Sequence, residues 1–370
     1  MIAENKIKAP FYQKFALVLI GLSLLVYLII LGKDILSPLV FGFLFAILLL
    51  PIANFFENKL RLPRSMAAIV SIFLLLGLIT GVLYLVGSQI SNLADDWPML
   101  KSQVQQSIKE LSQYIRHAFH ISQRKQMGYV EDTEKKIIAS GTDVIGQTFG
   151  AISSVLVFYI FSLIFCFFTL LYRHLLLKFL VWVFHEGHTH IVHDIVENVQ
   201  RILRQYILGL LLEMIVVATL ACTAFFFIGV KYAVLLGILI GLFNLIPYLG
   251  IFSALLLSCL ITFATGSINN TAMVAACVLG IHLIDSNFLL PTIVGSKVKL
   301  NAFVTFLGLL LGETIWGLSG MFLSIPIMAI LKIIFDRVED LKPWGYLLGT
   351  GKEIKIKKVK EEVGEEEKEE

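Results

Sequence analysis

The chain has 370 residues, of which 57% are hydrophobic and only 15% are charged, and its formal net charge is +3. A soluble core of this size cannot bury so much apolar surface, so the composition excludes an ordinary soluble domain. Lipid must cover the remaining apolar surface. The small net charge is less informative than the positions of the charged residues along the chain.

The apolar residues form blocks long enough to cross a hydrocarbon layer of roughly 30 Å, for which a helix needs about 20 residues. These runs of Leu, Ile, Phe and Val lack the alternation of barrel strands, and helices are the economical way to satisfy their backbones in lipid. We therefore expect an all-α integral membrane protein. The expected blocks are 15–32, 36–56, 66–87, 149–172, 207–229, 233–264, 271–290 and 302–335.

The first three blocks predict an N-terminal group of membrane helices over residues 1–88. Three lysines in residues 6–14 precede the first block, as in a signal peptide, but no A-x-A cleavage site follows and the run exceeds a typical signal core. We expect this helix to be retained. Three further basic residues in 59–64 separate the second and third blocks, so the positive-inside rule predicts that this loop and the N-terminus are cytoplasmic.

An extramembrane arm is expected over residues 89–148. Apolar residues recur at steps of three and four from Trp97 to Phe119, which predicts an amphipathic helix with one apolar stripe. That stripe could pack on its own hairpin partner, on a neighbouring subunit or on the bilayer surface. The simplest interpretation is a solvated structural arm.

Residues 149–205 are expected to hold a fourth membrane helix and, over 185–206, a second amphipathic helix on the cytoplasmic side. The latter contains a group of four histidines. Spacing of three residues can place two imidazoles on one face, but the sequence reads HExH and not the HExxH of zinc proteases. We expect a His-rich polar face and no metal site. The histidines are His185, His188, His190 and His193.

Residues 206–335 are expected to form a transport core, because two of its blocks are too long for one crossing. At 1.5 Å per residue, about 32 residues make roughly 48 Å of helix. Helix-breaking residues interrupt one long block at 243–250 and the other at 312–320. Each broken block follows an unbroken one, which predicts an internal repeat of two broken-helix units.

Two topologies fit this order. If both broken blocks cross fully, there are eight crossings and Lys297 and Lys299 face outside. If both are re-entrant, these lysines face the cytoplasm, as the positive-inside rule favours. Both topologies leave the two termini in the cytoplasm. The end of the chain, 336–370, is a charged tail, basic over 352–360 and mostly acidic over 361–370.

Ionisable residues within the apolar blocks are the first candidates for function, because a charge at the bilayer centre is costly and rarely faces lipid. Glu213, His282, Asp285 and Glu313 are such residues, and His282 and Asp285 share a helix face with Asn287 nearby. The alternative is a purely structural role, in which these side chains only join helices by hydrogen bonds. Glu313 is the strongest candidate for a proton or cation relay, because glycines flank the break beside it.

Three motifs, in order, resemble the autoinducer-2 exporter (AI-2E) family of permeases. They are NLIPYLG at 244–250, Asn287 with LPTIVG at 290–295, and Gly312-Glu313 with GLSGM at 317–321 followed by Ile325-Pro326. The specific match covers about 200–335, and the general layout of the rest also fits. Family members often carry an acid where this chain has Asn244.

The resemblance implies a homo-oligomeric transporter of the cytoplasmic membrane that exports a small solute such as autoinducer-2. Alternatives are a sodium/proton antiporter and a channel-like passive pore. The expected partners are the solute or ion and the lipid bilayer, with no nucleic acid. The expected transport pathway comprises Asn244, Pro247, Tyr248, Gly250, Asp285, Asn287, Pro291, Glu313, Gly317 and Gly320.

Enzymatic activity is not expected. The chain has no GxSxG and no HExxH sequence, and the glycines at 349–351 lack the spacing and the surrounding strand and helix of a phosphate-binding loop. A nucleotide-driven pump is therefore not predicted, and neither is a cofactor. A purely structural scaffold is the remaining alternative to transport.

Overall fold

The computed structural model describes residues 10–95, 102, 154–184, 189–246, 249–294 and 300–350. This part of the chain contains helices and no strands. Six of its helices are long and apolar enough to cross a membrane, and shorter apolar helices accompany them. These observations confirm the all-α membrane class. The expected arm lies outside the described residues, apart from residues 89–95, which extend a membrane helix, and residue 102.

Three helices open the fold: α1 (Phe11–Leu31), α2 (Lys33–Asn58) and α3 (Arg64–Asp95), with Gly32 alone between the first two. A side chain at Gly42 of α2 would lie 2.7 Å from the carbonyl oxygen of Ser162, so α2 packs closely on the helix Ser154–Val183. Small residues at such contacts are typical of membrane helices, because they let two backbones approach.

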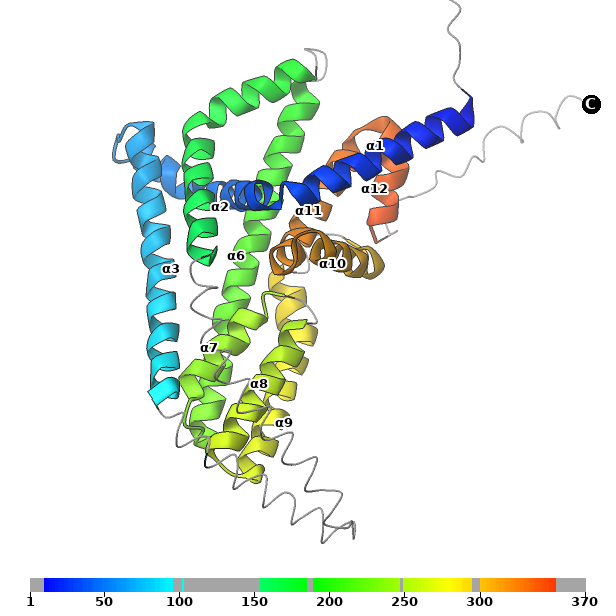
Figure 1. Ribbon diagram of the computed structural model, residues 1–370. Coiled ribbons are helices and arrows are strands. Elements are labelled where there is room, and N and C mark those ends of the chain that lie inside the picture. The colour runs from blue at the N-terminus through cyan, green and yellow to red at the C-terminus, as the bar shows by residue number, and fades with distance from the viewer. Residues whose placement is uncertain are drawn as a thin grey trace, which may run out of the picture.

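The helix Ser154–Val183 bends along its length, and its second half meets the start of α6 (Thr189–Ile228) at the upper end of the view in Figure 1. The sequence divided α6 at Tyr206 into an amphipathic helix and a membrane helix. The structure has one continuous helix of 40 residues, because no Pro interrupts the helical pattern there and a helix tolerates a single glycine such as Gly209.

Four elements follow α6: α7 (Ala233–Phe243), α8 (Leu249–Thr265), α9 (Ile268–Ile284) and the π-helix η2 (Asp285–Val294). Of these, α7, α9 and η2 pack on α6, and α8 packs on α9 and α7. Gly237 lets α7 approach α6, since a Cβ there would lie 2.3 Å from the Sγ atom of Cys222. A core of buried aliphatic and aromatic side chains, with Phe225, Leu236 and Val274 fully buried at its centre, joins α6, α7 and α9.

The last unit is the pair α10 (Ala302–Trp316) and α11 (Leu318–Arg337), followed by η3 (Glu339–Leu341) and α12 (Lys342–Leu348). Gly317 turns the chain between α10 and α11 with φ +62°, a backbone conformation that other residues rarely adopt. Asn301 caps the N-terminus of α10 and also donates a hydrogen bond from Nδ2 to the carbonyl oxygen of Leu347, 2.8 Å away.

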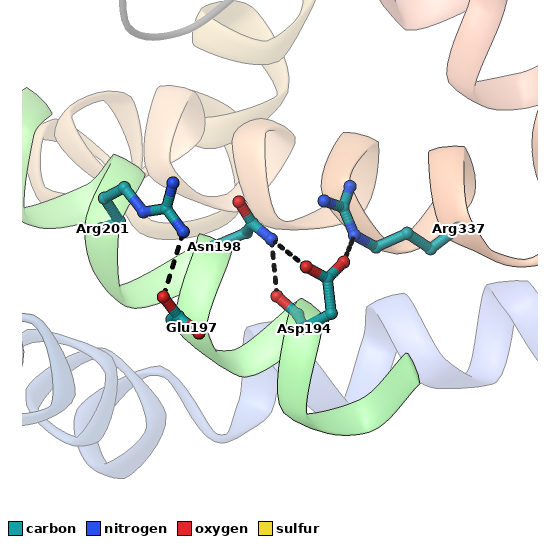
Figure 2. Close-up of polar contacts among 5 residues, drawn as sticks. All are labelled: Asp194, Glu197, Asn198, Arg201 and Arg337. Atoms are coloured by element: carbon teal, nitrogen blue, oxygen red, sulfur yellow. Dashed lines mark hydrogen bonds and ion pairs between the residues drawn. The ribbon is translucent and has the colours of Figure 1, made fainter. Parts of the chain in front are cut away.

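An ion pair links this last unit to α6. Arg337, the last residue of α11, contacts Asp194 of α6 (Figure 2), and Asn198 holds the same Asp194 carboxylate at 2.8 Å. The neighbouring pair Glu197 and Arg201 lies within α6 itself, at 3.2 Å. The end of α11 is therefore fixed to the first turns of α6.

Candidate functional site

The structure brings together three polar side chains that are 31 and 41 residues apart in the sequence. The Nδ2 atom of Asn244 donates hydrogen bonds to Oε1 of Glu213 and to Oδ2 of Asp285, each at 3.3 Å. Glu213 comes from α6, Asn244 caps the C-terminus of α7, and Asp285 begins η2. The amide thus connects two carboxyl groups from two other elements.

Both carboxyl groups are deeply buried, with 1% of Glu213 and 5% of Asp285 exposed. Each also has one buried oxygen without a hydrogen-bond partner among the described residues, Oε2 of Glu213 and Oδ1 of Asp285. Two buried acids are costly unless each is paired or hydrogen-bonded, and the neutral Asn244 amide offsets no charge.

A small cavity of about 20 Å³ lies beside the pair, lined by Asn244, Asp285 and His282 together with apolar side chains such as Val217 and Ile281. A space of roughly 10–15 Å³ is enough for one water molecule. Asp285 and Asn244 therefore line room for a single water or a bare ion, and the space is too small for a hydrated ion.

Local structure explains why these residues reach the site. α7 ends at Phe243, and Gly250 lets α8 start close by, since a Cβ there would lie 1.8 Å from the carbonyl oxygen of Phe243. Asn244 therefore lies in the turn between two short helices. Asp285 lies at the change from α-helix to π-helix, a geometry that is frequent at functional sites.

Other residues expected at the pathway lie around this centre. His282 is half-buried, lines the cavity and is 3.3 Å from the hydroxyl of Ser286. Asn287 is exposed and donates to the carbonyl oxygen of Leu283 at 2.8 Å, and Pro291 is exposed on η2. Pro247 and Tyr248 lie outside the described residues.

The structure does not bring Glu313 into this group. Glu313 is exposed on α10, whose main packing partners are α11, α1 and α2. Gly317 forms the turn after α10, and Gly320 is buried against Gly312. The second break therefore holds a tight glycine contact, whereas the buried acids lie in α6 and η2 and are connected by Asn244 at the first break.

The pairing of Glu213 with Asn244 is the relationship that sequence reasoning missed. Its signal in the sequence is that Glu213 is the sole acid in the block 207–229. The described residues include no cluster of three or more His, Cys, Asp or Glu side chains that could hold a metal ion. His185 and His188 of the histidine-rich segment lie outside them.

The described residues form several apolar helices that are long enough to span a membrane, and two acids are buried among them. These features define a polytopic membrane protein and are typical of the transporter class. Residues 16–340 match the AI-2E family transporter model, so the chain belongs to this family.

Three bacterial relatives support the same assignment. "Putative transport protein YrrI" of Bacillus subtilis is 27% identical over 316 residues, 82% of this chain and 86% of the relative. "Putative transport protein YueF" of the same organism is 23% identical, over 79% and 80% of the two chains. "Putative transport protein YhhT" of Escherichia coli is 22% identical, over 87% and 90%.

Proposed function

We propose that the chain is a secondary permease of the cytoplasmic membrane, assembled as a homo-oligomer, in which proton binding at Glu213 and Asp285 drives the movement of a small solute. The observation that carries the proposal is the pair of unpartnered buried oxygens on these two acids. A transporter couples two substrates when a buried site must be neutralised before the protein can change state.

A proton suits the site better than a metal ion does. Asn244 turns its N–H₂ group, the positive end of the amide, toward both acids. This arrangement favours the charged acids but opposes a cation placed between them. Divalent ions such as Ca²⁺ take six to eight oxygen ligands, whereas the site supplies two carboxyl groups. Sodium would require Asn244 to present its oxygen instead.

Autoinducer-2, moved by export, is the solute that the family resemblance implies. The Asn244 turn and η2 contribute backbone that is not regular α-helix, and such backbone at membrane depth is tolerated where it is buried in protein or lines a cavity. We place the solute pathway along these two segments, beside the acid pair.

The test is flux of autoinducer-2 in liposomes that contain the purified protein, with an imposed pH gradient, sodium gradient or neither. We expect a pH gradient to change the flux and a sodium gradient to leave it unchanged. Flux driven by sodium would establish the cation site instead, and flux that ignores both gradients would establish a passive pore. Proton movement without autoinducer-2 flux would identify a different solute.

A further inference from the structure

A large cavity in the described part of the chain, about 1290 Å³, is separate from the acid pair. It lies between the helix Ser154–Val183, α2, α6 and α11, and it exceeds the roughly 300–1,000 Å³ of pockets for drug-sized ligands. It is partly open, because Leu176, Val183 and Phe184 on its wall are 43%, 51% and 56% exposed. An occupant could therefore enter sideways from the bilayer.

Most of the lining is aliphatic or aromatic, including Leu177, Leu180, Ile195 and Ile334. One group of polar residues on the wall consists of Asn54 of α2 with Thr169, Arg173 and His174 of the neighbouring helix, and a second comes from the end of α11 and the residues after it. The lining of that helix runs from Thr169 to Phe184, and 15 residues at 1.5 Å each make about 22 Å. The wall is thus polar at one end of this helix segment and apolar along the rest.

The polar end carries excess positive charge. The Glu57 carboxylate is 2.5 Å from Nη2 of Arg173 and 3.1 Å from Nε of Arg64, so two guanidinium groups share one carboxylate. A guanidinium has five N–H donors, and the contact with Glu57 uses the Nη2 group of Arg173. His174 adds a ring that can donate a hydrogen bond beside it.

At η3 and the end of α11, by contrast, acidic residues offset the basic ones. Arg337 contacts Asp194 (Figure 2), and Lys342 lies 3.7 Å from Glu339. Glu339 and Asp340 line the cavity together with these two bases. An anion gains no net attraction there, so the charge distribution favours an anionic group at Arg173 and His174.

Exposed residues further along the same helix, toward the apolar end of the lining, are typical of the membrane interface. Trp182, on the same helix, is 82% exposed, and Lys178 is exposed one turn after His174. Tryptophan is enriched where hydrocarbon meets headgroups, and lysine reaches from apolar surface toward water. Basic pockets between membrane helices bind anionic lipid headgroups.

We propose that this cavity binds one anionic phospholipid, with its phosphate at Arg173 and His174 and its acyl chains along Leu177, Leu180 and α6. This site is independent of the transport site, and its occupant ties the Ser154–Val183 helix to α2, α6 and α11.

The test is native mass spectrometry of the full-length, delipidated protein in detergent, titrated with phosphatidylglycerol or phosphatidylcholine that carry identical acyl chains. We expect phosphatidylglycerol to bind about tenfold more tightly, the ratio that corresponds to one charge-assisted hydrogen bond. Equal affinity for the two lipids would overturn the headgroup site.

Variants locate the bound lipid. Arg173→Gln should bring the affinity ratio close to one, whereas the matched control Lys178→Gln removes a charge from the same helix outside the cavity lining and should keep it. An equal loss in both would mean that general surface charge attracts the lipid. Val196→Trp places an indole in the cavity from α6, whereas Arg173 and Glu57 belong to other helices, and it should weaken binding of both lipids.

Unchanged binding in Val196→Trp would place the lipid elsewhere and overturn the proposal. Dimers without bound lipid across the whole titration would show that a second copy of the chain covers the cavity, and they would overturn it as well. Val196→Trp removes no member of the ion pairs that Glu57 forms. This variant therefore remains informative if Arg173→Gln fails to fold.

Discussion

Gly312 of α10 and Gly320 of α11 meet backbone to backbone: a Cβ on Gly320 would lie 2.0 Å from the carbonyl oxygen of Gly312, and the reverse distance is 2.3 Å. The contact closes the α10 and α11 pair just before and after the turn at Gly317. Trp316 connects the same turn to α1, because its Nε1–H group donates a hydrogen bond to the carbonyl oxygen of Ile29, 3.0 Å away.

We expect Gly320→Ala to destabilise the protein, because a methyl group at this position must push two backbones apart. Overpacking of this kind costs about 1–3 kcal/mol. Thermal unfolding in detergent measures the effect. The matched control is Gly77→Ala in α3, where nothing lies within 4 Å of the added Cβ. Equal unfolding temperatures for the two variants would show that the α10 and α11 contact is not tight in solution.

Glu213→Gln and Asp285→Asn should each fold, insert and lose the dependence of flux on a pH gradient. Each change preserves the shape of the side chain but removes a carboxyl group that can exchange a proton. The sequence predicts a relay at Glu313 instead, so Glu313→Gln is measured in the same liposome assay. We expect its flux to keep the dependence on the pH gradient. Gradient dependence that survives in both acid-pair variants and disappears in Glu313→Gln would move the coupling site to the second break.

Asn244→Leu should destabilise the folded protein, because it removes the donor from two buried acceptors at once. An acceptor left unsatisfied costs about 1–3 kcal/mol. Adding Glu213→Gln to this variant should restore part of the loss, since the new amide removes one charge and brings its own donor. A double-mutant cycle on unfolding temperature measures this coupling. Strict additivity would mean that Asn244 does not connect the two acids.

The Asp194 and Arg337 pair should contribute little to stability although it joins α6 to α11. The two side chains are 54% and 31% exposed, and exposed ion pairs contribute about 0–1 kcal/mol. We expect a coupling energy in that range, falling as salt is added. The pair Glu197 and Arg201 within α6 is the control (Figure 2). A much larger coupling energy for Asp194 and Arg337 would indicate that this ion pair is desolvated and holds α6 and α11 together.

Single cysteines at Lys297 and Lys299 should react with impermeant reagents from the cytoplasmic side alone, as the re-entrant topology predicts. Both positions lie outside the described residues. The measurement compares labelling in intact cells with labelling in inside-out vesicles. A cysteine at Lys59, in the loop expected to be cytoplasmic, serves as the control. Reaction from outside would establish eight crossings and remove the inverted repeat.

The sequence by itself determined the class of the protein. Long apolar runs must be helical in lipid, because no water is present to satisfy a bare backbone. The motifs at Asn244, Asn287 and Gly312 pointed to the family, which the match over residues 16–340 confirms. The sequence predicted helix ends less well. α6 continues through Tyr206, because a change from polar to apolar residues does not interrupt backbone hydrogen bonds.

Tertiary structure decided which polar residues meet. Glu213 and Asp285 were both visible as buried charges in the sequence, but three helices had to pack before Asn244 could reach both. Glu313 has similar local surroundings in the sequence, yet α10 leaves it exposed. A sequence pattern fixes the face of a helix on which a residue lies, whereas the partner of that face depends on contacts between distant segments, which local periodicity does not encode.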